Sequence, residues 1–158
     1  MENDAELRWT LSRPDELDAC AMHDLLKLRV DVFVVEQTCA YPEIDGRDTL
    51  AGTRHLVGRD ARGEIVAYGR DLVDERDAGS PARIGRIAVA VPWRGRGVAR
   101  TLMRRLLADL DARCPERDVV LGAQLTAERL YASFGFVRDS EEYLEDGIPH
   151  VDMRLTRR

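Results

Sequence analysis

The sequence predicts a mixed α/β fold, in which one central, mostly antiparallel sheet with a single parallel crossover pair carries helices on both faces. The first observation is a strand–helix–strand order: residues 84–91 are β-branched and apolar, residues 98–110 repeat apolar side chains at a helical period, and residues 119–121 are apolar again. Two strands joined by one helix lie parallel. The second observation is a pair of strand-like runs, residues 55–58 and 65–73, which a polar loop with a glycine joins as a hairpin.

Length and composition place the chain among globular proteins with one core. It has 158 residues, of which 44% are hydrophobic, and we therefore expect a single domain over residues 1–158. An apolar run of about 18 residues, the length that predicts a membrane span, is not found in the sequence. The formal net charge of −5 argues against nucleic acid as the main partner.

The cysteines and the N-terminus favour a cytoplasmic protein. Cys20, Cys39 and Cys114 are scattered, so we expect free thiols in a reducing compartment. The N-terminus is acidic and lacks the apolar segment of a signal peptide. The three histidines lie far apart in the sequence, and we expect no metal site.

The N-terminal third should contain a strand, a helix and a long loop. Residues 7–11 alternate loosely and predict a first strand, after which Asp15 or Asp18 caps a helix. Residues 21–35 place apolar side chains at steps of three and four, which predicts an amphipathic helix with one face in the core. Pro42 and a following Asp-Gly pair predict a loop.

After the crossover the pattern predicts a short helix and a group of strands. Residues 126–134 form the helix, and Gly135 is its expected C-cap. The last strands are expected at residues 136–137, 143–144 and 150–155, the final one running along an edge of the sheet.

A basic turn with two glycines, residues 94–97, lies between the crossover strand and its helix. The first N–H groups of a helix have no partner inside it, and glycine leaves them accessible, so such a turn suits a phosphate or pyrophosphate. The alternative is an ordinary turn before an amphipathic helix. Val98 stands where a Walker A loop needs lysine, and Arg100 stands where a dinucleotide fingerprint needs a third glycine or alanine, so neither motif fits.

The turn resembles the coenzyme A pyrophosphate loop of the GNAT superfamily of acetyltransferases, whose pattern is Arg/Gln-x-x-Gly-x-Gly/Ala. Arg94, Gly97 and Ala99 fit this pattern, with Ala99 in place of the commoner glycine. A second GNAT signature, a short helix that ends in Tyr-x-x-x-Gly-Phe, follows in the expected order at residues 130–136.

Three further stretches are similar to the ElaA-type branch of this superfamily, which comprises small bacterial N-acetyltransferases. They lie at residues 28–37, 41–48 and 145–150, and the resemblance covers about residues 7–155. It implies the GNAT acyl-CoA N-acyltransferase fold. It also implies that acetyl-CoA, as co-substrate, gives its acetyl group to a primary amine of a small molecule or peptide.

The resemblance also implies which residues bind the coenzyme. Backbone N–H groups of the glycine turn would bind the pyrophosphate, and the main chain of the crossover strand would pair with the pantetheine arm and polarise the thioester carbonyl. The side chains of Arg94 and Arg96 either add charge or are solvated, and Gln124 either bonds the arm or is a polar loop residue. The expected coenzyme-binding residues are Ile87, Ala88, Val89, Arg94, Gly95, Arg96, Gly97, Val98, Ala99, Arg100 and Gln124.

Attack on the thioester requires a neutral amine, and the departing thiolate requires a proton. Tyr131 matches the general-acid tyrosine of the family; the alternative is a core aromatic on a helix face. The base is left open among Glu36, His55 and His150, each of which alternatively contacts the acceptor or is structural. The loop that contains Glu43, Asp45 and Asp48 is acidic, which suits either a cationic acceptor or a solvated turn.

Several alternatives stay open on sequence alone. A non-catalytic module of the same fold would bind acyl-CoA without needing Tyr131, and an enzyme that uses another acyl-CoA would need a wider cleft. A structural or nucleic-acid-binding domain fits the acidic balance poorly. Loops 38–53 and 74–82 are expected to determine the acceptor, and the edge strand 150–155 would allow a homodimer.

Overall fold

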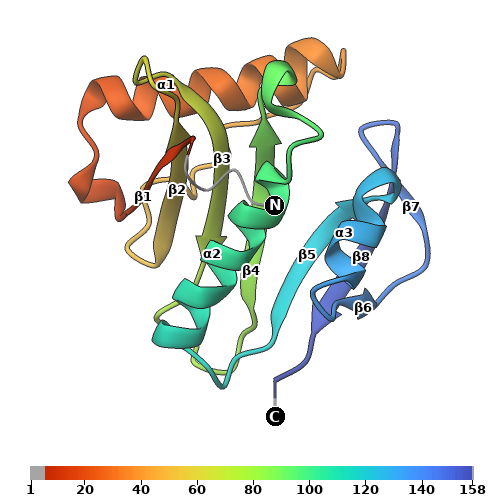
Figure 1. The fold of residues 1–158 in the computed structure, drawn as a ribbon. Helices are drawn as coiled ribbons and strands as arrows, with labels where there is room; N and C mark the ends of the chain where they lie inside the picture. The colour runs from red at the N-terminus through yellow and green to blue at the C-terminus, as the bar shows by residue number, and fades with distance from the viewer. Residues whose placement is uncertain (1–5, 158) are drawn as a thin grey trace.

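The computed structural model describes residues 6–157; residues 1–5 and 158 of the predicted domain lie outside this range. One sheet runs in the order β1-β2-β3-β4-β5-β8-β6, with β7 paired to β8, and only β4 and β5 are parallel (Figure 1). The predicted fold class is therefore confirmed. The strands are β1 (Arg8–Ser12), β2 (Thr53–Arg59), β3 (Ile65–Leu72), β4 (Ala82–Val89), β5 (Val119–Gln124), β6 (Val137–Arg138), β7 (Tyr143–Glu145) and β8 (Ile148–Leu155).

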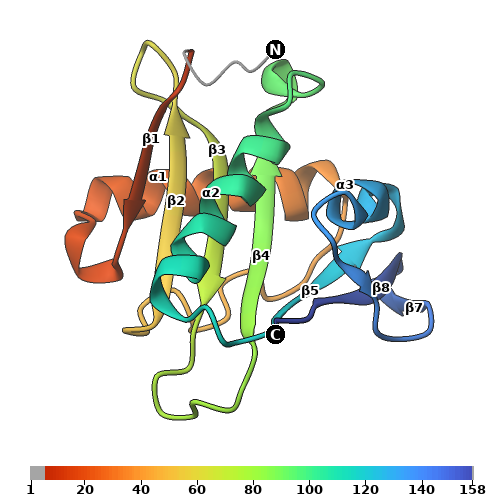
Figure 2. The same ribbon diagram turned by 60° about the horizontal axis from the view of Figure 1, so that its bottom comes forward.

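Helices cover both faces of the sheet, as predicted. Helix α1 (Ala19–Val30) lies on one face, and α2 (Val98–Arg113) and α3 (Glu128–Ala132) lie on the other (Figures 1 and 2). Successive strand residues divide between the two faces: Leu56 packs in the core beneath α2, whereas Val57 packs against α1. None of the helices in the described part of the chain is long and apolar enough to cross a membrane.

Helix α1 begins where the sequence predicted a cap. The side chain of Asp18 accepts a hydrogen bond from the backbone N–H of Ala21 at 2.7 Å. The α-helical bonding ends at Val30, short of the predicted end, and the chain continues as a π-helical turn over Asp31–Glu36. This wider turn carries Glu36 to the cavity described below.

The C-terminal region corrects one prediction. The strand expected at 150–155 is not an edge, because β8 pairs with β5 on one side and with β6 and β7 on the other. A homodimer formed through this strand therefore loses its basis. The helix expected at 126–134 is shorter, with a 3-10 turn over Leu125–Ala127 before α3, and Gly135 follows α3 with φ of 94°.

A β-bulge interrupts β4 at the centre of the sheet. Tyr68 pairs with Ala88 and Arg70 with Gly85, so two residues of β4 stand opposite Gly69 alone. Arg86, one of the two, has φ of 57°, a conformation that non-glycine residues rarely adopt. The bulge redirects the strand just before Ile87.

Candidate functional site

Strands β4 and β5 diverge and open a cavity in the middle of the sheet. Their ladder consists of only two pairs, Ala82 with Val119 and Arg83 with Val120, after which the strands separate (Figure 1). A cavity of about 690 Å³ occupies the opening, which is a typical size for a small-molecule site. Beyond Arg83 the edge of β4 that faces β5 has no ladder partner among the described strands, so its backbone groups are available to an extended ligand.

The predicted glycine turn follows the end of β4. Gly95 and Gly97 have φ of 73° and 79°, values that glycine adopts without strain. Gly97 is the N-cap of α2 and offers no side chain to its N–H groups. A Cβ added at either glycine would meet nothing within 4 Å. The turn therefore combines free backbone donors, the positive end of α2 and open space, the features that bind an anion.

The two arginines of the turn and Arg100 in the first part of α2 differ in position. Arg94 lines the cavity, where its Nε donates to the carbonyl of Val89 at 2.9 Å and its guanidinium pairs with Glu36 at 2.8 Å. Arg96 lies over the ring of Trp93, and Arg100 donates to the hydroxyl of Ser133 at 3.2 Å; neither lines the cavity.

The predicted strand residues Ile87, Ala88 and Val89 all line the cavity. The side chain of Ala88 is buried beneath α1, and Ile87 packs against the core on the other face of the sheet. What these residues present to the opening between the strands is therefore mainly backbone.

Tyr131 projects from α3 into the cavity. Its side chain is 8% exposed and packs edge-on against Phe136, with 6.4 Å between ring centroids. Burial raises the pKa of Tyr131 to about 12, so the phenol keeps its proton at neutral pH. No described group hydrogen-bonds to its hydroxyl, which leaves that proton available for donation.

The two histidines proposed as bases lie in different places. His55 is fully buried, with Nδ1 2.6 Å from the hydroxyl of Tyr68 and Nε2 2.8 Å from the carbonyl of Asp48. Burial lowers the pKa of His55, and the residue does not line the cavity. Because both ring nitrogens are engaged in the core, His55 is removed as a candidate base or acceptor contact.

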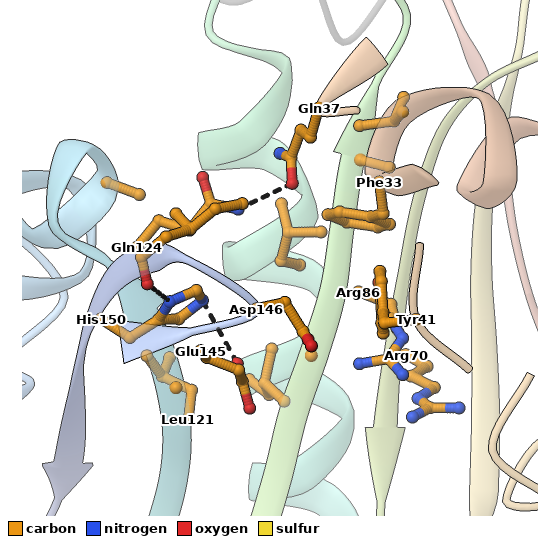
Figure 3. Close-up of a pocket in the computed structure, with 18 of the residues that line it drawn as sticks. Phe33, Gln37, Tyr41, Arg70, Arg86, Leu121, Gln124, Glu145, Asp146 and His150 are labelled. Carbon is orange, nitrogen blue, oxygen red and sulfur yellow. Dashed lines mark hydrogen bonds and ion pairs between the residues drawn. The ribbon is translucent and has the colours of Figure 1, made fainter. Parts of the chain in front are cut away.

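His150, in contrast, lines the cavity from β8. Its Nδ1 donates to the carbonyl of Ile148 at 2.7 Å, and because a carbonyl only accepts, this bond places a proton on Nδ1. Nε2 then lies 3.3 Å from a carboxylate oxygen of Glu145 (Figure 3). The ring also stacks on that of Tyr143, with 5.9 Å between ring centroids. His150 is thus held in one orientation, with Nδ1 engaged by the backbone and Nε2 on the side of Glu145.

Glu36 and Gln124 form contacts across the mouth of the cavity. Hydrogen bonds from Arg94 hold the pKa of Glu36 below its ordinary value, which weakens this carboxylate as a base. The amide of Gln124 donates to the side chain of Gln37 at 3.2 Å, so the end of β5 is joined to the segment after α1 (Figure 3).

The acidic loop belongs to a buried ion network that the sequence did not reveal. Arg29 is fully buried and pairs with Glu43 at 2.6 Å and with Asp48 at 2.5 Å. Arg70 pairs with Asp48 at 2.8 Å and with Asp45 at 2.5 Å. The loop is therefore neither a solvated turn nor a free acidic surface, because its carboxylates are neutralised by arginines of α1 and β3.

The position of Arg29 on the apolar face of the predicted helix could have indicated this network. Arg29 falls four residues after Leu25 and three before Val32, on the helix face that those side chains bury. A charged residue on a buried face requires a partner of opposite charge, and the acidic loop was the nearest source. Among the described residues no group of three potential ligands is placed to hold a metal ion.

Comparisons with known proteins agree with this geometry. A family model described as "Acetyltransferase (GNAT) domain" matches residues 25–157. A UPF0039 protein of Mycobacterium tuberculosis is 46% identical over 140 residues, which cover 87% of this chain and 86% of that protein. Protein ElaA of Escherichia coli is 41% identical over 147 residues, which cover 93% of this chain and 95% of ElaA.

Two solved structures have the same fold as this chain. The crystal structure of Escherichia coli ElaA superposes with a TM-score of 0.89 at 39% identity, covering 96% of this chain and 99% of ElaA. The structure of an acyl-CoA N-acyltransferase from Pseudomonas aeruginosa superposes with a TM-score of 0.87, also at 39% identity, covering 94% of this chain and 98% of that chain.

Proposed function

The chain belongs to the GNAT family of acetyltransferases, in its ElaA-like branch, and from this premise we propose that it transfers the acetyl group of acetyl-CoA to a primary amine of a small molecule or peptide. One observation carries the proposal: the cavity between the diverging strands β4 and β5 begins beside the glycine turn at the start of α2 and is lined by both Tyr131 and His150. Three free thiols and the need for acetyl-CoA favour the cytoplasm as the place of action.

Acetyl-CoA would lie along β4. Backbone N–H groups of residues 95–100 bind the pyrophosphate at the start of α2, and the pantetheine arm extends along the unpaired edge of residues 87–89. A backbone N–H of this segment would donate to the thioester carbonyl and stabilise the oxyanion that forms on attack. Arg94, already in the cavity, and Gln124 at the end of β5 are positioned to contact the arm.

The acceptor nitrogen must lose two protons, and the departing sulfur must gain one. We assign His150 as the base: Nε2 takes the first proton from the ammonium form of the acceptor, and Glu145 stabilises the imidazolium that results. The neutral amine attacks the carbonyl carbon, and the tetrahedral intermediate collapses by breaking the carbon–sulfur bond. Tyr131 donates its proton to the departing sulfur, and the nitrogen then gives its second proton to the phenolate oxygen of Tyr131, so that the products are the acetylated amine and the CoA thiol.

The coenzyme site is tested first by calorimetry with acetyl-CoA on the wild type and on Gly97→Glu. The new side chain places a negative charge where the pyrophosphate should meet the backbone, and we expect micromolar binding to be lost. Gly63→Glu is the matched control, because Gly63 has φ of 83°, similar open space and a position in the β2–β3 turn. This control carries the same strain and charge but should bind normally.

Turnover is tested next with Tyr131→Phe. We expect kcat for amine acetylation to fall by about a hundredfold, a typical contribution of a general acid, with acetyl-CoA affinity unchanged. A folded wild type that does not bind acetyl-CoA would overturn the proposal. Binding without acetylation of any amine would favour a non-catalytic acyl-CoA module, and faster transfer from another acyl-CoA would change the assigned donor.

A further inference from the structure

Two arginines of the cavity lining have guanidinium groups that are not held by a hydrogen bond or an ion pair from the described residues. Arg47 lies in the loop after α1 and Arg83 lies on β4, and both are exposed. Neither guanidinium forms a hydrogen bond or an ion pair with any group in residues 6–157. By comparison, Arg70, Arg86 and Arg94 of the same cavity pair with Asp45, Glu43 and Glu36 at 2.5, 2.8 and 2.8 Å.

Arg47 and Arg83 lie far from the glycine turn, where the coenzyme phosphates are proposed to bind. Arg83 stands at the start of β4 and Val89 at its end, so about 20 Å of strand lies between Arg83 and the residues that precede the glycine turn. Arg47 belongs to the same end of the cavity. The carbonyl of Arg47 accepts a hydrogen bond from the hydroxyl of Thr53 at 2.6 Å. Thr53 on β2 pairs with Leu72 on β3, and Leu72 pairs with Arg83 on β4, so the backbone of Arg47 lies level with Arg83.

The β8 side of the cavity is acidic. Asp152 lines it from β8 and Asp146 from the turn before β8, on the same side as the Glu145–His150 pair. Asp152 accepts a hydrogen bond from the hydroxyl of Tyr143 at 2.6 Å. Figure 3 shows Glu145, Asp146 and His150 on this side, across the cavity from Arg70 and Arg86. The cavity therefore has arginines on its β3–β4 side and carboxylates on its β8 side.

We propose that the acceptor is an amine that also carries a carboxylate some distance away, such as a peptide with a free C-terminus; this inference rests on the N-acetyltransferase function proposed above. Arg83 and Arg47 bind the carboxylate, for which a planar guanidinium provides paired donors, and the amine lies toward His150. A carboxylate suits these arginines better than a phosphate, because a second negative charge would be repelled by the carboxylates on the β8 side of the cavity.

The test compares acceptors that differ only in this carboxylate. Pooled tripeptides with a free C-terminus, the same peptides as C-terminal amides, and spermidine are offered with acetyl-CoA, and release of the CoA thiol gives kcat/KM. We expect the wild type to prefer the free peptides by about tenfold to a hundredfold, the range for a hydrogen bond between charged groups. In Arg83→Gln and Arg47→Gln the preference should fall below about threefold, with the amides used as before.

Arg62→Gln is the matched control, since Arg62 is an exposed arginine of the β2–β3 turn outside the cavity, and its preference should equal that of the wild type. Thermal unfolding of all three variants checks that the fold is retained. Equal or faster use of the amides or of spermidine by the wild type would overturn the inference while leaving the transferase function intact. Acetylation of none of the three classes by a protein that binds acetyl-CoA would overturn both.

Discussion

At the residue scale, the environments of the candidate groups decide their chemistry. Glu36 and His150 both line the cavity, but Arg94 holds Glu36 as a paired carboxylate, whereas the carbonyl of Ile148 fixes the ring of His150 with Nε2 toward the cavity side. Tyr131 keeps its proton because it is buried. The same residue types elsewhere, such as His55 and Tyr68, bond to each other inside the core and are structural.

The assignment of the base predicts different kinetics for two substitutions. His150→Gln should lower kcat by about a hundredfold, because it removes the group that takes the proton from the amine. Glu36→Gln should leave kcat within about twofold and raise the KM for acetyl-CoA, because it releases Arg94 from its partner near the coenzyme. Steady-state kinetics on both variants measure the contrast. Equal losses of kcat in the two variants would contradict the assignment.

At the scale of elements, the divergence of β4 from β5 and the bulge at Arg86 create the site. A regular ladder along both strands would close the opening with hydrogen bonds between the strands. Instead the two pairs at Ala82 and Arg83 join the halves of the sheet, and the rest of β4 remains available for a ligand. The loop between α1 and β2 is fixed over this opening by the buried ion network of Arg29 and Arg70.

A glycine at the end of this loop is required by close packing. A Cβ at Gly52 would lie 1.7 Å from the carbonyl oxygen of Val73, and that carbonyl belongs to the backbone and cannot rotate away. We expect Gly52→Ala to reduce the free energy of unfolding by about 3 kcal/mol, at the upper end for overpacking. Chemical denaturation of the variant and the wild type measures this change in the free energy of unfolding. Gly79→Ala is the control, because its nearest contact would be 3.5 Å from a side-chain oxygen of Asp77. Similar stabilities of the two variants would contradict the packing argument.

At the scale of the whole molecule, two buried charge clusters make stability depend on pH in opposite directions. In the network over the cavity, burial alone would raise the pKa of Asp48, but Arg29 and Arg70 lower it. Its contribution is therefore present above the ordinary aspartate range and is lost on acidification. On the other face of the sheet, Asp71 is fully buried and shares Arg113 with Asp109, at 2.7 and 2.6 Å.

Burial, and then the neighbouring Asp109, raise the pKa of Asp71 to about 8. Because the folded state holds this proton more tightly than the unfolded state, the stability from Asp71 is greatest at low pH and is lost as pH rises toward about 8. We expect Asp71→Asn to gain stability relative to the wild type between pH 5 and 8, and to show no further gain above it. Thermal unfolding across this range is the measurement. A difference between the two proteins that is constant with pH would contradict the raised pKa.

The sequence by itself determined the fold class and the position of the glycine turn between β4 and α2. The two glycine-containing signatures, residues 94–99 and 131–136, are local, and their chemistry depends on backbone conformation, which short sequence patterns specify. The strand–helix–strand order likewise required the parallel pair of β4 and β5. Most elements were predicted to within a few residues, with α1 the main exception.

Only the tertiary structure decided which charged groups line the cavity and which are paired in the interior. The pairing of Arg29 with Asp48, the burial of His55 and the position of Arg83 in the cavity lining depend on contacts between segments far apart in the chain. The burial of β8 between β5 and its other neighbours depends on the same kind of contact. Hydrogen bonds, desolvation and charge neutralisation act between neighbours in space, and local periodicity carries no information about them.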